Sequence, residues 1–243
     1  MEKTYVALDL ETTGLSPARD RILEIGAVKV TDGEISDTYS MLVDCGMKIP
    51  ARITELTGIS NEMLQEAVLR GEAKKTKEAV SGLLDFCGEL PVLGHNILFD
   101  YSFVKRQAVN MGRKFDNQGI DTLKIARRFL PELPQRSLGA LCSHYGIIQE
   151  KQHRAEDDAR AASELYRILA AGFEKQDAAA FLPRPLVYQV KKQGPATNFQ
   201  KAYLNDLVKY HRINLDVSVE SLTKNDASRL IDKIIFSYGR IKR

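Results

Sequence analysis

The sequence is poor in cysteine. Its 243 residues contain three cysteines, Cys45, Cys87 and Cys142, which are odd in number, widely spaced and without a CxxC pair. This pattern argues against a disulfide framework and against a thiolate metal site. We expect each cysteine to be a small buried apolar residue in a reducing compartment.

The sequence also lacks a long apolar run. Its apolar stretches fall far short of the roughly 18 residues that a transmembrane helix needs, and Glu2 and Lys3 precede a strand-like run rather than the apolar region of a signal peptide. Because 44% of the residues are hydrophobic, the chain can still build a globular core. These features predict a cytoplasmic protein without a membrane partner.

The net charge of +3 is small but unevenly distributed. Residues 183–243 contain twelve Lys and Arg residues against five Asp and Glu residues, which leaves residues 1–182 with a net negative charge. A locally basic segment can bind phosphate backbones without regard to sequence. A solvated helical face has the same composition and is the alternative.

An Asp-x-Glu triplet follows the first strand-like run. Residues 4–8 are rich in β-branched and aromatic side chains, which predicts a buried strand, and Asp9 and Glu11 come at its end. At positions i and i+2 of a strand the two carboxylates point to the same face, and they repel each other unless a cation lies between them. A divalent metal ion meets that need, whereas a solvated strand end is the alternative.

The spacing of apolar residues predicts an α/β fold. Three strand-like runs at the start, the last ending near Val43, predict an antiparallel meander. Short strands and helices then alternate, which predicts a mixed sheet flanked by helices. The later strands are expected over residues 91–95 and 119–121, and the helices over residues 52–56, 61–69, 74–87, 97–111, 122–129, 137–145 and 155–173.

A proline-rich stretch precedes the last part of the chain. Residues 182–197 contain three prolines, Gly194 and Lys191-Lys192 with little periodicity, which is typical of a linker. Beyond it, two more helices are expected, the second with Thr223 as N-cap and Asp226 completing a capping box. We therefore predict a domain over residues 1–175, a linker over residues 176–197 and a small basic helical module over residues 198–243.

Three more side chains have the chemistry of a metal site. Asp100 opens a predicted helix just past a strand, and His153 and Asp158 straddle the start of an alanine-rich helix. Together with Asp9 and Glu11 they make four carboxylates and one imidazole near strand ends and helix starts. Hard oxygen ligands in this number favour Mg²⁺ or Mn²⁺ over zinc.

Such a set predicts the hydrolysis of a phosphodiester. Two divalent ions can stabilise the attacking and the leaving oxygen of an in-line displacement, and a histidine can take a proton from water at neutral pH. Each residue alone has a simpler explanation: Asp100 could be a helix cap, and His95 could be a core histidine bonded to the backbone. Their joint order along the chain favours the metal site.

The same residues carry a family resemblance. Three motifs resemble those of the DEDD superfamily of 3′-5′ exonucleases, in the DnaQ-like subtype whose third motif contains a histidine. The motifs are Asp9-x-Glu11-Thr12-Thr13-Gly14-Leu15, Gly94-His95-Asn96-x-x-Phe99-Asp100 and His153-x-x-x-x-Asp158. Residues 4–172 resemble this module throughout, with the greatest likeness to the proofreading exonucleases of bacterial DNA polymerase III. The resemblance implies a ribonuclease H-like fold, with a five-stranded mixed sheet flanked by helices.

The resemblance also implies a role for each motif residue. Asp9 would bridge two divalent cations, Glu11 and Asp158 would complete the site of the ion that activates water, and Asp100 would serve the second ion. His153 would be the general base. Thr12 would contact the 3′-hydroxyl and Leu15 would pack on the last base. The full set of expected substrate contacts is Thr12, Thr13, Gly14, Leu15, His95, Asn96, Phe99 and Phe103.

The implied activity is the release of nucleoside 5′-monophosphates from single-stranded or frayed 3′ ends of DNA, in repair or proofreading. An unpaired end is expected because a base inside a duplex offers no free face for stacking. An exoribonuclease of the same superfamily is the alternative, since no residue reveals a contact to a 2′-hydroxyl. A non-catalytic scaffold is a third class, and the intact set of acids argues against it.

Residues 183–243 do not follow from the exonuclease motifs. We predict that they grip nucleic acid through basic side chains. The alternative is a module that docks on a polymerase or on another replication or repair protein. The candidate basic residues are Lys201, Lys209, Arg212, Lys224, Arg229, Lys233 and Arg240.

Overall fold

The computed structural model describes residues 1–149, 153–190, 194–215 and 217–241. The chain divides into two compact units, one made of Met1–Cys45 and Pro50–Val190 and the other of Gly46–Ile49 and Lys191–Arg243. Among the helices in these ranges, none is long and apolar enough to cross a membrane. All three cysteines are free and buried, as predicted.

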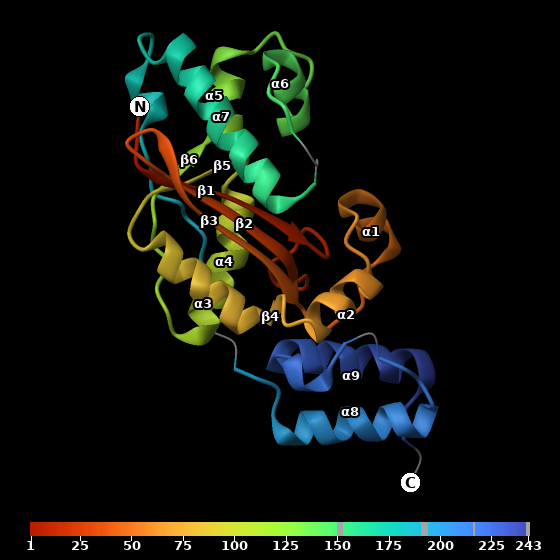
Figure 1. Cartoon of the computed structure of the whole chain (residues 1–243). Coiled ribbons are helices and arrows are strands. Elements are labelled where there is room, and N and C mark those ends of the chain that lie inside the picture. Colours follow the sequence, from red (N-terminus) through yellow and green to blue (C-terminus); the bar gives the residue numbers. More distant parts are fainter. Residues whose placement is uncertain (150–152, 191–193, 216, 242–243) are drawn as a thin grey trace. The chain divides into compact units, whose positions relative to one another are not determined.

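The first unit is built on a mixed sheet (Figure 1). Its strands are β1 (Tyr5–Thr12), β2 (Ile22–Thr31), β3 (Glu34–Asp44), β4 (Ala73–Lys75), β5 (Val92–Gly94) and β6 (Gly119–Asp121). They lie in the order β4-β3-β2-β1-β5-β6. Strand β2 pairs antiparallel with both β1 and β3, whereas β4 pairs parallel with β3, β5 with β1, and β6 with β5. The predicted meander is therefore confirmed. The short edge strand β4 adds a sixth strand to the five that were expected.

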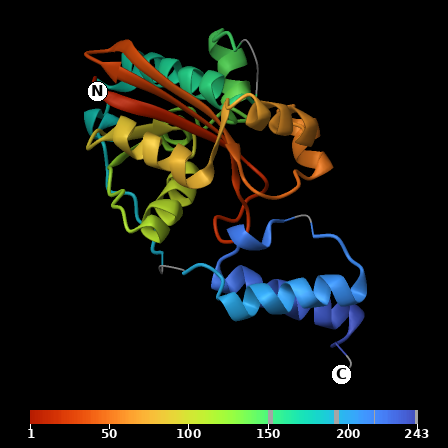
Figure 2. The ribbon, with the colours of Figure 1, turned by 60° about the horizontal axis from the view of Figure 1, so that its bottom comes forward.

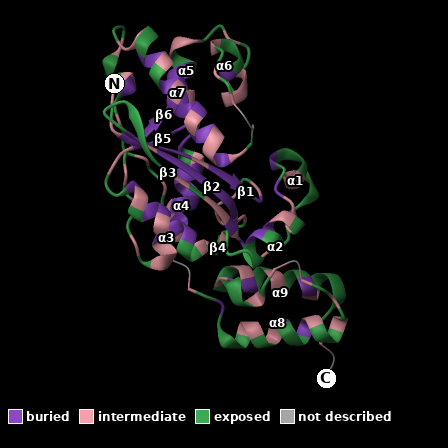
Figure 3. Ribbon diagram, viewed as in Figure 1, coloured by how far each residue is buried: buried purple, intermediate pink, exposed green. Residues whose placement is uncertain are grey.

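Helices cover both faces of this sheet (Figures 1 and 2). They are α1 (Ala51–Thr57), α2 (Asn61–Leu69), α3 (Thr76–Cys87), α4 (Leu98–Met111), α5 (Thr122–Phe129), α6 (Leu138–Tyr145) and α7 (Ala155–Phe173). Side chains of α3 and α4 form a buried cluster with one face, and those of α5, α6 and α7 form a second cluster with the other. Strands β1, β2, β5 and β6 thus form a buried middle layer, whereas β3 and β4 are mostly exposed or half-buried (Figure 3). This arrangement confirms the predicted α/β class.

The two faces of β1 have different partners. Val6, Leu8 and Leu10 belong to the cluster of α3 and α4, whereas Tyr5 and Ala7 belong to the cluster of α7. Because side chains alternate along a strand, positions 9 and 11 continue the face that α7 covers. The hydrophobic pattern of β1 therefore aims both acids of the first motif at the start of α7.

A glycine lets α7 lie directly on the sheet. Gly26 of β2 pairs with Asp9 of β1, and a Cβ at Gly26 would lie 2.0 Å from the carbonyl carbon of Ala155 and 2.1 Å from the backbone nitrogen of Glu156. Atoms cannot approach that closely, so any side chain at position 26 would push the first turn of α7 away from the sheet. Position 26 must therefore be glycine for α7 to pack this closely on the sheet.

The chain after α7 is packed rather than free. Residues 176–190, which fall in the predicted linker, lie within the first unit. A short 3₁₀ helix, η1 (Ala178–Phe181), buries Phe181 completely, and Arg184 pairs with Gly119 on the open edge of β6. An aromatic residue directly before the proline-rich stretch was the signal that this segment has a packing partner. Of the remaining predicted linker, residues 191–193, including Lys191-Lys192, lie outside the described residues.

The second unit contains two helices, α8 (Asn198–His211) and α9 (Lys224–Tyr238), and a short 3₁₀ helix, η2 (Val219–Ser221). Both long helices begin with a capping box, and the predicted one at Thr223 and Asp226 is confirmed. A small apolar core joins them, built from Ala196, Leu204, Leu207, Leu222, Ala227 and Ile234. Within the same unit, Met47 forms an isolated antiparallel bridge with Val217.

The contact at Gly26 generates a prediction about stability. Gly26→Ala should lower the free energy of unfolding by about 3 kcal/mol or more, because overpacking against backbone atoms has no flexible side chain to absorb it. The measurement is urea unfolding followed by circular dichroism.

The matched control is Gly172→Ala near the other end of α7, the helix that Gly26 contacts. A Cβ at Gly172 meets no atom within 4 Å, and alanine is the better helix former by up to about 1 kcal/mol, so this variant should be as stable as the wild type or more stable. Equal stability of the Gly26→Ala variant and the wild type would contradict the contact between α7 and β2.

Candidate active site

The predicted acids gather at one edge of the sheet. Strands β1, β5 and β6 run parallel, so their carboxyl ends meet there. Asp9 and Glu11 come from the end of β1, Asp100 from the first turn of α4 after β5, and Asp158 from the first turn of α7. Three segments that are far apart in sequence therefore supply these four acids.

Asp100 is fixed by the backbone of β1. Its side chain is buried, and Oδ1 accepts a hydrogen bond from the backbone nitrogen of Leu10 at 3.0 Å. Strand β5 pairs with β1 only at Val6 and Ala7, so beyond that point this carboxylate takes the place of a strand partner. The bond ties the start of α4 to the residue between Asp9 and Glu11.

The third motif meets the first. The candidate ligand atoms of Glu11, His153 and Asp158 all lie within 4.8 Å of one another. Asp158 also accepts a hydrogen bond from Nε2 of Gln149 at 2.7 Å, and His153 has a left-handed backbone with φ of 60°. The structure thus brings together the acids and the histidine that the sequence predicts, and the imidazole lies as close to Glu11 and Asp158 as a metal ligand would.

A buried ion pair holds this arrangement and was not predicted. Glu24 of β2 lies directly opposite Glu11 and is 2% exposed. Its carboxylate accepts bonds from Nε of Arg154 at 3.0 Å and from Nη2 at 2.6 Å, and the backbone nitrogen of Ala155 donates to it at 3.0 Å. Glu24 thereby anchors both residues that follow His153. A glutamate inside an otherwise apolar strand was the signal that could have revealed it.

Burial and mutual repulsion disturb the acids. Burial, followed by the charge of Asp158, raises the pKa of Glu11 to about 8, and burial raises the pKa of Asp158 to about 6 although His153 opposes the shift. Burial, then Asp100 and Asp158, raise the pKa of Asp9 well above its usual range. Burial also raises the pKa of Asp100, against its bond from Leu10.

The residues fit divalent cations. Arg154 lowers the pKa of Glu11, but its guanidinium is committed to Glu24, so it does not neutralise the cluster. Glu11 and Asp158 place candidate ligand atoms within 4.8 Å of each other and of His153, and carboxylate oxygens are the ligands that hard cations prefer. Asp9 and Asp100 are not part of this group of three, but burial and then the charges of Asp100, Asp158 and Glu11 raise the pKa of Asp9, so these acids interact.

The loop after Glu11 is closed by its own polar groups. The hydroxyl of Thr12 donates to the carbonyl of Gly14 at 2.7 Å and keeps the ability to accept a bond. Thr13 is buried and its hydroxyl accepts from the backbone nitrogen of Arg21 at 2.9 Å, so it holds the loop together. Leu15 is 85% exposed at the tip. Thr12 is also buried and Gly14 is partly exposed, so of the four predicted contacts in this loop Leu15 is the fully exposed one.

Both ring nitrogens of His95 have partners within the protein. Its Nε2 lies 2.8 Å from the carbonyl of Arg136 and its Nδ1 lies 2.9 Å from the hydroxyl of Thr122. Because a carbonyl cannot donate, Nε2 carries the proton, and burial lowers the pKa of the ring. The ring is half-buried and lines a surface hollow together with Asn96 and Arg127, so a contact to substrate stays a prediction. Its neighbour Asn96 is exposed with φ of 70°, and its backbone nitrogen donates to Asp121 at 3.1 Å.

The predicted contact at Phe103 is wrong because this side chain is 1% exposed within the core. Phe99 lies beside it, with the two ring centroids 5.1 Å apart, and is partly exposed. On a helix, residues i and i+4 share a face, so the buried ring of Phe103 packs against the ring of Phe99 and does not reach a ligand. The motif spacing gave the helix face but not the depth of each position.

A groove leads away from the acids past the start of α6. One hollow is lined by His153 and Asp158 and the next by Asn96 and Arg127, and Ser137, the N-cap of α6, lines both. The groove therefore joins the second and third motifs along one surface. It is open rather than enclosed, as a site for a chain-like ligand must be.

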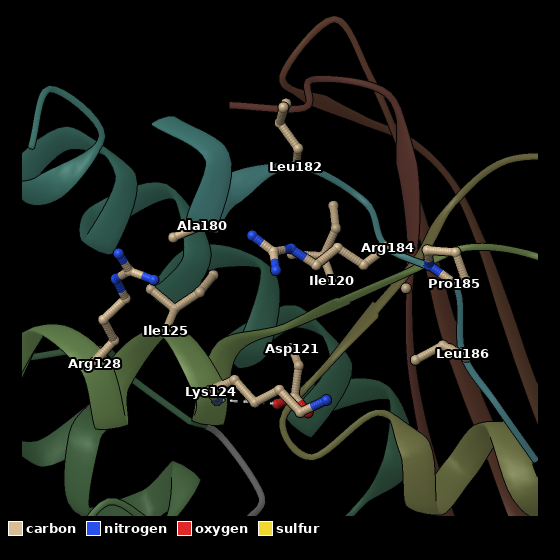
Figure 4. Close-up of a pocket in the computed structure, with 11 residues that line it drawn as sticks. Ile120, Asp121, Lys124, Ile125, Arg128, Ala180, Leu182, Arg184, Pro185 and Leu186 are labelled. Carbon is tan, nitrogen blue, oxygen red and sulfur yellow. Dashed lines mark hydrogen bonds and ion pairs between the residues drawn. The ribbon is translucent and has the colours of Figure 1, made fainter. Parts of the chain in front are cut away.

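A separate cavity lies at the edge of β6 (Figure 4). Three cationic side chains, Lys124, Arg128 and Arg184, surround its apolar floor. Arg128 is paired with Asp177, and Arg184 donates to the carbonyl of Ala179 at 3.0 Å. Because these two guanidinium groups hold the returning chain in place, the cavity belongs to the packing of residues 178–186 against β6.

The model of the exonuclease family, RNase_T, matches residues 6–166, which include all three motifs. The chain belongs to the exonuclease family. This confirms the predicted resemblance to the DEDD 3′-5′ exonucleases, and membership of the family implies dependence on a divalent metal.

Relatives of this exonuclease chain occur among bacterial replication proteins. It is 40% identical over 163 residues to a PolC-type DNA polymerase III of Clostridium perfringens, covering 67% of this chain and 11% of the polymerase. It is 34% identical over 169 residues to the DNA polymerase III subunit epsilon of Aquifex aeolicus, covering 68% of this chain and 80% of the subunit. The chain thus spans about a ninth of the PolC-type relative.

A solved exonuclease has the same fold. Exonuclease I of E. coli, in complex with a dT13 oligonucleotide, superposes with a TM-score of 0.62 at 18% identity, covering 72% of this chain and 42% of that chain. At this identity the likeness concerns the fold, and it confirms the ribonuclease H-like architecture that the motifs implied.

The raised pKa of Glu11 predicts how the metal-free exonuclease responds to pH. A carboxyl whose pKa is raised on folding favours the folded state when protonated, so stability should fall as the pH rises from about 4.5 to about 8. Each unit of raised pKa corresponds to about 1.4 kcal/mol. We expect the free energy of unfolding in EDTA to decrease by a few kcal/mol across this range.

The control is Glu11→Gln, which cannot ionise. In EDTA its stability should decline less than that of the wild type over the same pH range, and it should exceed the wild type near pH 8. Parallel pH profiles for the two proteins would contradict a strained carboxylate at position 11.

Proposed function

We propose that this chain is a metal-dependent 3′-5′ exonuclease that removes nucleotides from single-stranded or frayed 3′ ends of DNA, in repair or proofreading. The observation that carries the proposal is the convergence of Glu11, His153 and Asp158 within 4.8 Å, in a chain of the exonuclease family. Asp9 interacts with these acids, because burial and then the charges of Asp100, Asp158 and Glu11 raise its pKa.

The acids would hold two divalent cations, Mg²⁺ or Mn²⁺. Asp9 would be shared, Glu11 and Asp158 would bind one ion, and Asp100 would serve the other. When bound, such ions stabilise negative charge on the attacking and leaving oxygens of a phosphoryl displacement. The backbone nitrogen of Leu10 donates a hydrogen bond to Asp100, and the side chain of Gln149 donates one to Asp158. These bonds orient both carboxylates without a bound ligand.

His153 would take the proton from the attacking water. The water oxygen forms a bond to the phosphorus of the terminal phosphodiester, and the bond from phosphorus to the 3′ oxygen of the preceding nucleotide breaks. The products are a nucleoside 5′-monophosphate and a strand with a new 3′-hydroxyl. His153 is exposed, so its proton can pass to solvent after each cycle.

The loop at Thr12 to Leu15 would recognise the 3′ end. Thr12 can accept a bond from the terminal hydroxyl, because its own proton is used on Gly14. Leu15 offers an exposed apolar surface to the last base. Asn96 and the partly exposed Phe99 would line the path of the strand, in the groove that passes Ser137.

DNA is the favoured substrate because the relatives are DNA polymerase III proteins and because exonuclease I of E. coli was solved with a DNA oligonucleotide. An association with a polymerase remains part of the proposal, since a PolC-type relative carries a similar segment within a much longer chain.

A labelled-strand assay tests the activity. Single strands of DNA and of RNA, labelled at the 5′ end, are incubated with Mg²⁺, Mn²⁺ or EDTA. We expect stepwise shortening of DNA with either metal, none in EDTA, and a loss of at least a thousandfold in rate for Asp9→Ala, because one carboxylate serves both ions. Equal shortening in EDTA would contradict the metal mechanism, and faster shortening of RNA would assign the exoribonuclease alternative.

His153→Ala separates the base from a ligand. Loss of a general base should slow the chemical step by about 100- to 10,000-fold, while the rise in melting temperature on adding Mn²⁺ stays close to that of the wild type. The measurements are single-turnover rates and thermal melts of the same samples. A variant that loses the metal-induced rise would make His153 a ligand instead.

A further inference from the structure

One face of α9 combines two cations with a bare aromatic ring. Arg229, Lys233 and Phe236 follow one another at spacings of four and three residues, which places them on one stripe of the helix. All three are exposed, and Phe236 is 93% exposed. We call these three residues the α9 stripe. The opposite side of the helix packs Ala227 and Ile234 into the core of the second unit.

The α9 stripe is costly for the helix by itself. Neither Arg229 nor Lys233 forms an ion pair with any residue that the structure describes. Like charges four residues apart destabilise a helix. An exposed phenylalanine contributes no hydrophobic stabilisation, because its surface stays in contact with water. Lys201, by contrast, is paired with Glu220, so it is less available than predicted. Lys209 and Arg212 at the end of α8 also form no ion pair with a described residue, but on α9 two such cations share one face with an exposed ring.

We propose that the α9 stripe binds single-stranded nucleic acid, with Arg229 and Lys233 on phosphates and Phe236 stacked on a base. The proposal rests on the proposed function for the identity of the strand as DNA. The second unit has twelve Lys and Arg residues against five Asp and Glu residues, so its charge complements a polyanion. The two cations lie about 6 Å apart along the helix axis, close enough to engage neighbouring phosphates of one strand.

The ring favours a nucleic acid over an acidic protein segment. Every unpaired base offers a flat face, and stacking on an aromatic side chain tolerates any sequence. An exonuclease that shortens strands of any sequence needs contacts of this kind. An acidic segment would satisfy Arg229 and Lys233 but would leave Phe236 without a matching surface.

The test measures binding of the full chain, in EDTA, to a fluorescent poly-dT strand of about 30 nucleotides at several salt concentrations. Arg229→Gln with Lys233→Gln should weaken binding and lower the slope of log affinity against log salt by about 1.4, because each phosphate contact on a single strand contributes about 0.7. Phe236→Ala should weaken binding roughly five- to one-hundred-fold and leave that slope unchanged.

The matched control removes two charges elsewhere. Lys114 and Lys175 are exposed and follow the far ends of α4 and α7, whose first turns carry Asp100 and Asp158. Lys114→Gln with Lys175→Gln should leave affinity and salt slope close to those of the wild type. Because all the substituted side chains are exposed, melting temperatures should not change, which excludes misfolding as a cause.

The outcomes separate this proposal from the proposed function. If the wild type shortens DNA but the stripe variants bind poly-dT as the wild type does, the α9 stripe is overturned and the exonuclease stands. If the stripe variants lose binding but the wild type shortens no strand, the reverse holds. Full DNA affinity in Phe236→Ala, together with tight binding of polyglutamate by the wild type, would assign the surface to an acidic protein.

Discussion

The contact between the first turn of α7 and strand β2 at Gly26 is the constraint on which the site depends. With no side chain at position 26, helix backbone lies directly on sheet backbone, one strand away from Asp9. Asp158 can therefore reach Glu11. The same approach brings the positive end of a helix dipole to a cluster of acids, where it offsets part of their repulsion. The absence of a Cβ at Gly26 thus determines both how closely α7 packs on β2 and how near its N-terminus lies to the acids.

Glu24 and Arg154 show how the fold handles surplus charge near this contact. Glu24 faces Glu11 across two strands, and a free carboxylate there would add to the repulsion. The guanidinium of Arg154 and the backbone of Ala155 neutralise Glu24 and draw the helix start toward β2. The repulsion that remains is confined to the acids proposed to bind metal, so the strain is stored where a ligand can relieve it.

Local patterns were enough to predict the elements but not the depth of each residue. Periodicity and capping signals placed every strand except β4, together with helix α5 and the capping box at Thr223, because these depend on neighbours along the chain. Residues 74 and 75 of β4 were assigned to the helix that follows them. Phe103 was assigned to the ligand because motif spacing says nothing of what covers a side chain. Glu24 was missed for a related reason: its partner Arg154 lies 130 residues away.

Residues 178–186, which return along β6, affect which part of the chain can fold as an independent exonuclease domain. The family model ends at residue 166, yet Phe181 fills the core and Arg184 pairs with Gly119 on the open strand. A piece cut at the family boundary would keep every acid and lose the cover of an unpaired sheet edge, and such edges recruit other chains into aggregates. The unit that can move between proteins is therefore longer than the unit that its motifs define.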